Sequence, residues 1–457
     1  SEPMPERTGG PLFHVVWDRR YGGDLQGVEE KLDELAELGV TAIYFNPLFE
    51  AKSNHKYDCA DYMKIDPHFG TNEEFKAFVD DAHARGIRII LDIVYNHCGN
   101  AHWAFTDAVA KGQESDTYDW FEFKRWPLPT DWRNEKPEDY YACWWGFGDL
   151  PDLNFDLGRR APEESNVRDK STVRVNEPLM AHLKEVTEYW IGTMDCDGVR
   201  LDVANEVPFW FWVDFNNWVK TVKPDAYIVG EIWGNASDWI GPTLFDATMN
   251  YAFFRDPVLK FLGQGRGTAR EFDRSLAAGR NAYPSQSVAV MMNLLGSHDT
   301  VRFREQVGGD LNKVKLAMLF GMTYVGAPHI YYGDEIGMLG GKDPDCRRPF
   351  RWNWEEDPER VELHGLIRTL ARARAEHTSL RRGSFTTLAA DGSVFVYLRE
   401  LEGERILVAL NAGKATGAVD LAAPLRDASG VDLVTGDTVN LNGLTLPPES
   451  GIAVVLR

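Results

Sequence analysis

Short runs of β-branched and aromatic residues alternate with longer stretches of helical period along most of the chain. The stretches 27–38, 72–85 and 178–193 place apolar residues at the spacing of one helix face. This alternation predicts βα units around a parallel sheet, and eight strand runs are the number that closes a (β/α)8 TIM barrel. The runs expected to be strands are 14–18, 41–46, 88–96, 198–203, 227–231, 246–250, 289–295 and 329–332.

The interval 98–176, after the third strand run, is too long for a simple connection. It is rich in Trp, Pro, Asp and Gly, and its aromatic content favours an ordered unit over a disordered insert. We expect a small inserted domain, called domain B below. Its tryptophans are Trp103, Trp120, Trp126, Trp132, Trp144 and Trp145.

The pattern changes again after a helical stretch at 360–376. The segments SVFVYLREL, RILVALN, GVDLVTG and GIAVVLR follow, separated by Gly, Asp and Asn turns, which is typical of an antiparallel β-sandwich. The predicted organisation is therefore an α/β protein with an inserted domain and a C-terminal sandwich. Its ranges are 1–97 and 177–380 for the barrel, 98–176 for domain B and 381–457 for the sandwich.

Composition narrows the class of partner. The 457 residues, 44% hydrophobic and 26% charged, hold no apolar run near the roughly 20 residues that span a bilayer, which indicates a soluble globular protein. A formal charge of −21 repels a phosphate backbone and anionic lipid, so neither nucleic acid nor a membrane is an expected partner. The 15 tryptophans suit a neutral sugar, whose apolar faces stack on aromatic rings, although most of these rings are expected in the core.

The cysteines and the N-terminus indicate a cytoplasmic location. The five cysteines are scattered and form no CxxC pair, so neither a disulfide framework nor a zinc site is expected. The first residues, SEPMPERTGG, lack the basic and apolar pattern of a signal peptide. The cysteines are Cys59, Cys98, Cys143, Cys196 and Cys346.

Polar residues close four of the strand runs, and the carboxyl ends of barrel strands are where function gathers. Taken singly, an Asp at a strand end is more often a helix cap or turn residue. Taken together, their order and spacing resemble the conserved regions of the α-amylase family, glycoside hydrolase family 13, from about residue 11 to the C-terminus. The four segments are DIVYNH (92–97), GVRLDVANE (198–206), GEIW (230–233) and LLGSHD (294–299).

The resemblance implies three essential carboxylates. Asp202 matches the nucleophile, Glu231 the general acid/base, and Asp299 the third carboxylate, which binds sugar hydroxyls. A retaining mechanism needs its two carboxyl groups about 5–5.5 Å apart, which neighbouring strands of one barrel can provide.

Further residues match the sugar-binding positions of the family. Arg200 lies two residues before Asp202 on the same side of the strand and can keep it ionised, although a structural ion pair is the rival interpretation. His97 and His298 match histidines that hydrogen-bond the sugar, and Tyr57 matches a ring that stacks on it. Asp343 and Arg347 match a pair that binds the next sugar. The alternatives are a core or capping role for His97, loop packing for Tyr57 and a surface ion pair for Asp343 with Arg347.

No cofactor or catalytic metal is expected, because neither HxxEH-like nor EF-hand spacing occurs. Asn96 matches a calcium ligand of many secreted α-amylases. The position of a second ligand, a His in those enzymes, is Glu206 here, so the match to a structural calcium site is incomplete.

Longer stretches, among them SNHKYDCADYMKIDPHFGT and IYYGDEIGM, resemble the neopullulanase and cyclomaltodextrinase subfamily. The resemblance implies cleavage of small or cyclic α-1,4/α-1,6 malto-oligosaccharides of the cyclic maltosyl-maltose, cyclodextrin or pullulan type, and a homodimer. Asn205 and Glu206 match a signature pair beside the acceptor subsites. The segment LPDLN, which ends at Asn154, favours tolerance of α-1,6 bonds, and Gly234 after Trp233 alters the acceptor side.

Typical members of the subfamily carry an N-terminal domain, whereas the first strand run here begins near residue 13. Two rival functions remain open. An oligo-1,6-glucosidase or a transglycosylase would use the same residues, and product analysis separates these. A catalytically silent sugar-binding subunit usually lacks one of the acids. Trp144, Trp145 and Phe147 either shape the sugar cleft or pack domain B.

Overall fold

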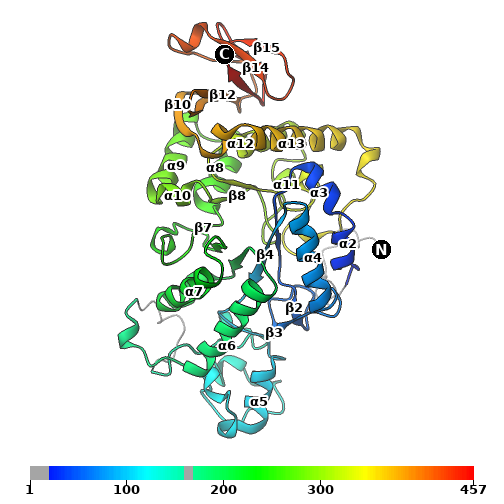
Figure 1. Ribbon diagram of the computed structural model, residues 1–457, viewed down its shortest axis with the longest axis vertical. Coiled ribbons are helices and arrows are strands. Elements are labelled where there is room, and N and C mark those ends of the chain that lie inside the picture. Colours follow the sequence, from blue (N-terminus) through cyan, green and yellow to red (C-terminus); the bar gives the residue numbers. More distant parts are fainter. Residues whose placement is uncertain (1–19, 159–167) are drawn as a thin grey trace. The chain divides into compact units, whose positions relative to one another are not determined.

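A computed structural model describes residues 20–158 and 168–457 (Figure 1). The strand expected at 14–18 lies outside the described residues. The chain divides into two compact units. The first contains residues up to 36, 41–232 and 239–248, and the second contains 37–40, 233–238 and 249–457.

A parallel sheet forms the centre of the first unit, and it confirms five of the expected strands with shorter bounds. Its order is β1-β4-β5-β6-β7, and every residue of β5 is buried. A strand buried on both faces reads as a continuous apolar run, which explains why the sequence identified these segments. The strands are β1 (Ala42–Phe45), β4 (Arg88–Ile93), β5 (Gly198–Leu201), β6 (Tyr227–Gly230) and, for the run at 246–250, β7 (Ala247–Thr248).

Helices with one apolar face cover this sheet. α4 (Asn72–Ala84) begins with a capping box in which Thr71 and Glu74 satisfy each other's backbone N–H groups. It buries Phe75 and Phe78 on one side, in agreement with its helical period. The other helices are α2 (Leu25–Glu29), α3 (Leu32–Leu38), α6 (Glu177–Glu188), which continues into a π-helical turn (Tyr189–Thr193), and α7 (Phe209–Val222). In the same unit, the strands β2 (Phe49–Ala51) and β3 (Cys59–Ile65) form an antiparallel pair.

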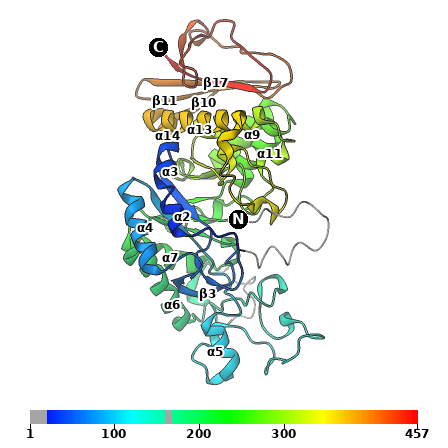
Figure 2. The same ribbon diagram turned by 90° about the vertical axis from the view of Figure 1, so that its right-hand side faces the viewer.

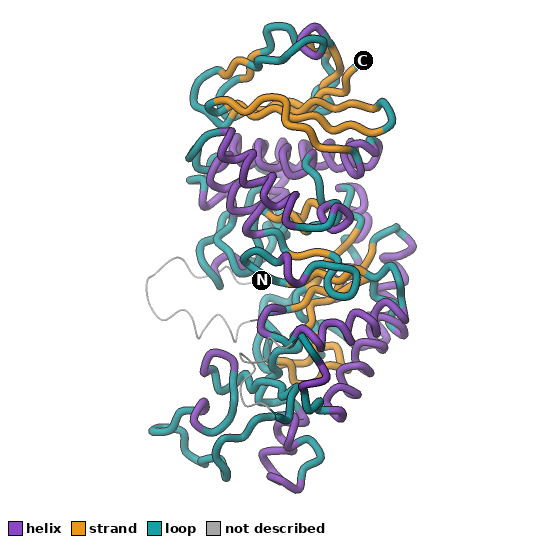
Figure 3. Tube along the Cα trace, turned by 90° about the vertical axis from the view of Figure 1, so that its left-hand side faces the viewer, coloured by secondary structure: helices purple, strands orange, loops and turns teal. Residues whose placement is uncertain are grey.

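The described residues of the segment predicted as domain B lie mostly in loops around one helix, α5 (Trp103–Lys111), as the loop colour in Figure 3 shows. Its own aromatic cluster orders it. Phe105 of α5 lies 4.9 Å from Phe121 and 5.1 Å from Tyr141 between ring centroids. Single-turn helices complete the segment: Gly112–Glu114, Tyr118–Trp120, Pro137–Asp139, Trp144–Gly146 and Lys170–Thr172.

The second unit contains the last described barrel strands, β8 (Met292–Leu294) and β9 (Ala327–His329), which pair in parallel. Two expectations differ from the structure here. The one-turn helix α10 (Ser285–Val288) is capped by Ala289, so the strand expected from residue 289 starts three residues late. The run 329–332 leaves the strand at His329, because Tyr331 and Asp334 form a turn. The helices are α8 (Asp256–Val258), flanked by π-helical turns at Tyr251–Arg255 and Leu259–Gly263, α9 (Ala269–Ala282), α11 (Phe303–Gln306), α12 (Leu311–Thr323), α13 (Pro358–Glu376) and α14 (Thr378–Arg382).

A six-stranded antiparallel sheet ends the chain, in the order β10-β11-β12-β17-β14-β15. Alternate residues of β11 face two different cores. Phe395 and Tyr397 join the cluster that includes Phe320 of α12, while Val396 joins the cluster that includes Leu446. The sheet lies over the helices of its own unit in Figure 2. The strands are β10 (Ser384–Asp391), β11 (Val394–Leu401), β12 (Glu404–Asn411), β14 (Ser429–Asp432), β15 (Thr438–Asn440) and β17 (Ser450–Leu456), with the pair β13 (Gly417–Ala418) and β16 (Thr445–Leu446) as a small second layer.

Candidate active site

Arg200, fully buried on β5, lies at the centre of a cluster of carboxylates in the first unit. One terminal nitrogen lies 2.9 Å from Asp92 Oδ1 and 2.7 Å from Asp202 Oδ1. The other lies 2.9 Å from Glu231 Oε2. A single guanidinium therefore holds three acids, two of which are the predicted nucleophile and acid/base.

Strand register brings these side chains together. Asp92 of β4 is the register partner of Arg200. The backbone N–H of Asp202 donates to Ile93 O at 3.1 Å, and that of Glu231 donates to Leu201 O at 2.9 Å. Asp202 and Glu231 thus each follow the last residue of a parallel strand, and the carboxyl ends of parallel strands share one edge of a sheet.

The backbone after Asp202 is unusual. Val203 has φ 39° and ψ 42°, the left-handed conformation that a β-branched residue rarely adopts. In this conformation its N–H donates to Glu231 Oε2 at 3.0 Å. Backbone strain of this kind concentrates at functional sites, and here it supplies a second donor to the Glu231 carboxylate.

The charges of the cluster do not balance, because three carboxylates face one guanidinium. Burial raises the pKa of Asp202, Arg200 opposes that rise, and the Glu231 and Asp92 carboxylates add to it. The Asp202 carboxyl therefore holds its proton more readily than a free aspartic acid does. Two carboxyl groups that interact through one cation are a suitable arrangement for acid/base and nucleophilic work.

Asp92 is a site residue that the sequence reasoning did not single out. It is 1% exposed, and its Oδ2 accepts hydrogen bonds from Tyr57 Oη at 2.8 Å and Tyr44 Oη at 2.9 Å. With Arg200 it fixes the ring of Tyr57, the predicted stacking residue. The sequence feature that could have identified Asp92 is its position at the start of DIVYNH, as an acid on a strand whose neighbouring residues are apolar.

His97 is buried, and its ring stacks on Trp144 with 5.1 Å between centroids. Burial lowers the pKa of His97 to about 3, so the ring is neutral and can offer only one N–H. Trp144 Nε1 donates to Glu206 Oε2 at 3.0 Å. Trp145 stacks on Trp144 and is 74% exposed. Trp144 thus joins His97 to the predicted acceptor-side residue Glu206.

The two predicted asparagines differ in their surroundings. Asn205 is exposed on the single turn Ala204–Glu206. The amide of Asn154 donates to Asp119 O at 3.2 Å, and its backbone carbonyl accepts from Asn176 Nδ2 at 2.8 Å. Asn154 therefore holds domain B segments together, and its contact with substrate stays a prediction.

The second unit carries the remaining predicted residues. His298 is buried, and its Nε2 lies 2.9 Å from Asp299 Oδ2. Arg347 Nη2 lies 3.3 Å from Asp299 Oδ1, and Arg347 Nε lies 2.7 Å from Asp343 Oδ1. Arg347 thus joins Asp299, the predicted third carboxylate, to Asp343, its partner in the pair predicted to bind the next sugar. Its Nε also donates to the backbone carbonyl of His298 at 3.0 Å.

Trp233, predicted on the acceptor side, presents an open ring in the same unit. Its ring stacks on Tyr251 at 4.0 Å with an interplanar angle of 7°, and the residue is 47% exposed. The hydroxyl of Tyr251 lies 3.1 Å from Ser297 Oγ, in the segment that carries Asp299. Trp233 is therefore a braced aromatic platform of the kind on which sugar rings stack.

Within residues 20–158 and 168–457, no three His, Cys, Asp or Glu side chains gather as metal ligands would. Asn96, the predicted match to a calcium ligand, is buried with its amide nitrogen 3.2 Å from His97 Nδ1 and 3.5 Å from Asp152 Oδ1. In the part of the chain that the structure describes, no helix combines the length and apolar character that crossing a membrane would require.

Comparison with known proteins identifies the class. Residues 14–364 match the family model described as alpha amylase, catalytic domain, and residues 385–450 match maltogenic amylase, C-terminal domain. The chain belongs to the α-amylase family of glycoside hydrolases, whose catalytic domain is the (β/α)8 barrel predicted from the sequence. The predicted fold and enzyme class are confirmed.

Individual relatives show which group within the family this chain resembles. The chain is 40% identical over 430 residues to a cyclomaltodextrinase of Geobacillus thermopakistaniensis, covering 93% of this chain and 68% of the relative. It is 40% identical to neopullulanase 2 of Thermoactinomyces vulgaris, covering 95% and 71%. Its fold matches the ligand-free cyclic α-maltosyl-(1→6)-maltose hydrolase of Arthrobacter globiformis with a TM-score of 0.83 at 35% identity, covering 96% and 91%. The predicted resemblance to the neopullulanase and cyclomaltodextrinase group is confirmed.

Proposed function

We propose that the protein is a retaining hydrolase of small or cyclic α-1,4/α-1,6 malto-oligosaccharides, with Asp202 as nucleophile and Glu231 as general acid/base. The observation that carries the proposal is the contact of both carboxylates with the one buried guanidinium of Arg200. Acids held by one side chain at the ends of adjacent strands are neighbours, as the short carboxyl separation of a retaining enzyme requires.

The reaction would proceed in two displacements. Asp202 attacks the anomeric carbon while Glu231 gives its proton to the glycosidic oxygen, so the C–O bond to the leaving sugar breaks and an ester to Asp202 forms. Glu231 then takes a proton from water, whose oxygen attacks the same carbon and releases Asp202. The N–H of Val203 and the guanidinium of Arg200 stabilise the carboxylate form of Glu231 between the two steps.

The other site residues would bind sugar. Tyr57 offers its ring face with its hydroxyl fixed on Asp92, and neutral His97 offers one N–H. Asp299 would bind sugar hydroxyls while Arg347 holds it in place, and Trp233 would carry the acceptor sugar. These roles rest on the surroundings of each residue and on the family resemblance.

Support for a cyclic or α-1,6-linked substrate comes from the relatives. The cyclic α-maltosyl-(1→6)-maltose hydrolase has also been solved with its cyclic substrate, and its chain resembles this one with a TM-score of 0.81 at 34% identity. Cyclomaltodextrinase and neopullulanase relatives are similar at about the same level of identity. We therefore place cyclic maltosyl-maltose first among the substrates to test.

Product chromatography tests the proposal. The wild-type protein is incubated in parallel with cyclic maltosyl-maltose, β-cyclodextrin, pullulan, panose and maltotriose, with Asp202→Asn as the blank. We expect maltose-sized products that appear first as the α-anomer in proton NMR. First appearance of the β-anomer, or no cleavage of any of the five sugars, would contradict the proposal. Products longer than the substrate would instead indicate transfer to sugar.

The homodimer and the cytoplasmic location stay predictions. Size-exclusion chromatography with light scattering tests the first, and fractionation of cells that produce the protein tests the second. The domain boundaries at 98–176 and 381–457 also stay predictions, which limited proteolysis tests.

A further inference from the structure

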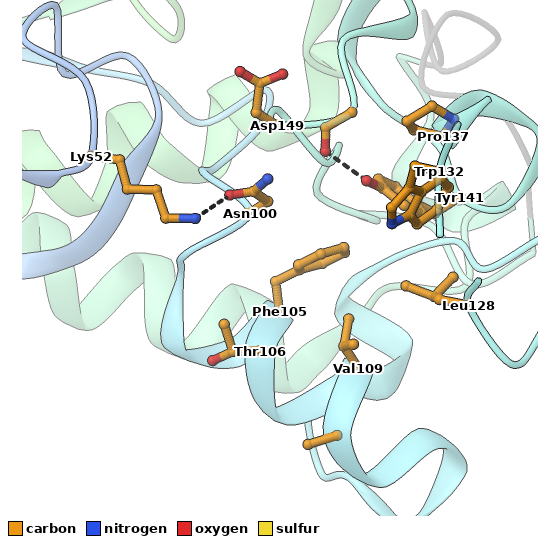
Figure 4. Close-up of a pocket in the computed structure, with 12 residues that line it drawn as sticks. Lys52, Asn100, Phe105, Thr106, Val109, Leu128, Trp132, Pro137, Tyr141 and Asp149 are labelled. Carbon is orange, nitrogen blue, oxygen red and sulfur yellow. Dashed lines mark hydrogen bonds between the residues drawn. The ribbon is translucent and has the colours of Figure 1, made fainter. Parts of the chain in front are cut away.

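A pocket of about 630 Å³ lies between domain B and the loop that carries Lys52 (Figure 4). This volume falls within the roughly 300–1,000 Å³ that small-molecule sites usually have. Helix α5 forms one wall of the pocket, and residues 128–141 face it. The lining residues are Lys52, Asn100, Phe105, Thr106, Val109, Ala110, Leu128, Trp132, Pro137, Tyr141, Gly148 and Asp149.

Aromatic rings provide most of the apolar lining. Phe105 and Tyr141 are 4% exposed and form a packed floor, while Trp132 is 36% exposed. The ring of Trp132 is braced edge-on by Tyr140 at 5.4 Å and Tyr141 at 6.3 Å between centroids. A partly exposed, braced indole beside a hydrophobic floor suits the apolar face of a ring-shaped ligand.

One cationic and one anionic side chain line the pocket at the side nearest Asn100. Lys52 Nζ donates to Asn100 Oδ1 at 2.9 Å, and the carboxylate of Asp149 is exposed beside them. An anionic ligand would meet Asp149, and a cationic one would meet Lys52. A neutral polyhydroxylated ligand can donate to Asp149 and accept from Lys52, so it satisfies both groups.

The pocket shares two chain segments with the candidate active site. Residues 97–100 run antiparallel to residues 149–152, with a bridge between His97 and Asp152. Along these segments Cys98 N donates to Pro151 O at 3.1 Å, and Asn100 N donates to Asp149 O at 2.9 Å. One end of this pair carries His97, and the other end carries the polar side of the pocket.

We propose that this pocket is a second sugar site, which binds an α-glucan unit of about the size of maltose apart from the catalytic carboxylates. The identity of the sugar rests on the proposed function, since a neutral glucan is the ligand that the active site would encounter. The pocket itself rests on its lining, in which a braced tryptophan faces hydrogen-bonding groups of both signs.

Isothermal titration of the full-length Asp202→Asn protein with maltose tests the proposal. We expect this protein to bind one maltose more per chain than the active site alone holds. Trp132→Ala in the same background should lose that one additional maltose at the concentrations used, because losing a stacked ring weakens binding by about tenfold or more. Trp126→Ala is the matched control, since Trp126 lies in the same segment, is 41% exposed and does not line the pocket. It should bind as many maltose molecules as Asp202→Asn does.

A second variant guards against unfolding of the first. Ala110 is exposed on α5 and lines the pocket, so Ala110→Trp would place an indole in it without removing any core side chain. This variant should also lose the one additional maltose. In the catalytically active background, Trp132→Ala and Ala110→Trp should cleave the preferred small substrate within about twofold of the wild-type rate.

The outcomes separate the two proposals. Equal numbers of bound maltose molecules in Asp202→Asn, Trp132→Ala and Ala110→Trp, with normal turnover by the wild type, would overturn the second site alone. Absence of turnover on every glucan would instead count against the proposed function.

Discussion

Arg200 of the first unit and two buried arginines of the second unit, Arg374 and Arg399, have different partners. In the first unit, Arg200 contacts three carboxylates; burial lowers its pKa, but the Asp92 and Glu231 charges outweigh burial and raise the pKa overall. In the second unit, Arg374 and Arg399 donate hydrogen bonds to backbone carbonyls. Burial lowers the pKa of each of these two residues to about 10.

The difference shows what each buried charge does. Arg374 donates to the carbonyls of Met322 and Tyr324, and Arg399 donates to that of Thr323 at 2.7 Å. These carbonyls lie at the C-terminal end of α12, where a helix leaves its last C=O groups without helical partners. The two arginines therefore cap a helix, whereas Arg200 holds together acids that would otherwise repel one another.

The largest expected effect concerns the acids themselves. Asp202→Asn or Glu231→Gln should lower kcat by about a thousandfold or more, because each removes a group that forms or breaks a bond with the substrate. The isosteric amides keep the shape of the site, so the thermal unfolding midpoint should change by only a few degrees. Steady-state kinetics with the preferred substrate measures the loss. Activity above a tenth of wild type in either variant would show that the role was assigned wrongly.

Next in size, Arg200→Met and Arg374→Met should separate the two kinds of arginine. Arg200→Met leaves three buried carboxylates without their cation, so we expect a loss of about 3–5 kcal/mol of folding free energy and near-complete loss of activity. Arg374→Met leaves buried carbonyls unpaired, which costs about 1–3 kcal/mol, while the folded fraction should keep kcat within about twofold. Urea unfolding and kinetics on the same samples measure both. Equal loss of kcat in the two variants would remove the distinction.

A smaller effect is expected at Trp144. Trp144→Phe keeps a ring against His97 but removes the N–H that binds Glu206. We expect kcat/KM to fall by about three- to tenfold, which corresponds to the roughly 0.5–1.5 kcal/mol that a typical hydrogen bond contributes. Trp145→Phe is the matched control, since it retains an aromatic ring at the neighbouring exposed position. An equal fall in both variants would assign the effect to ring size rather than to the hydrogen bond.

The smallest expected effect is on the pH dependence of folding stability, and it concerns the buried, uncharged imidazole of His102. Burial lowers the pKa of His102 to about 3, below the value of about 6.5 in the unfolded chain. As the pH falls below 6.5 the unfolded chain binds the proton first. The contribution of His102 to stability is therefore complete above pH 6.5 and is lost progressively towards pH 3.

His102→Asn should make the decline of unfolding free energy between pH 7 and pH 4 less steep, by up to about 1.4 kcal/mol per pH unit. Asparagine can still cap α5, where His102 Nδ1 accepts from Ala104 N–H. Urea unfolding at several pH values measures the slope. An unchanged slope would mean that His102 titrates alike in both states.

Much of the fold could be predicted because several barrel strands are short apolar runs directly followed by a polar residue. Asp202 and Glu231 were found in this way, since each directly follows its strand. Asp92 was missed because its partners, Tyr44 and Tyr57, lie 48 and 35 residues away along the chain. No local pattern reports such contacts, and the same holds for the hydrogen bond from Trp144 to Glu206.

Other differences arise from short elements. Helix α10 spans four residues, too few for a helical period to be recognised, so the late start of β8 behind it could not be predicted. The left-handed conformation of Val203 contradicts the local preference of valine for extended backbone, so the residue type gave no indication of it. The aromatic content of domain B gave no indication that Trp132 would line a pocket.

The arginine caps of α12 also bear on how the chain is made. A ribosome releases α12 well before residue 374, and Arg399 belongs to β11 of the C-terminal sheet. Until both arginines have emerged, the carbonyls at the end of this helix have only water as a partner. The barrel strand β9 begins at Ala327, soon after α12 ends at Thr323, so vectorial synthesis supplies the arginine caps of α12 only after β9 has been made.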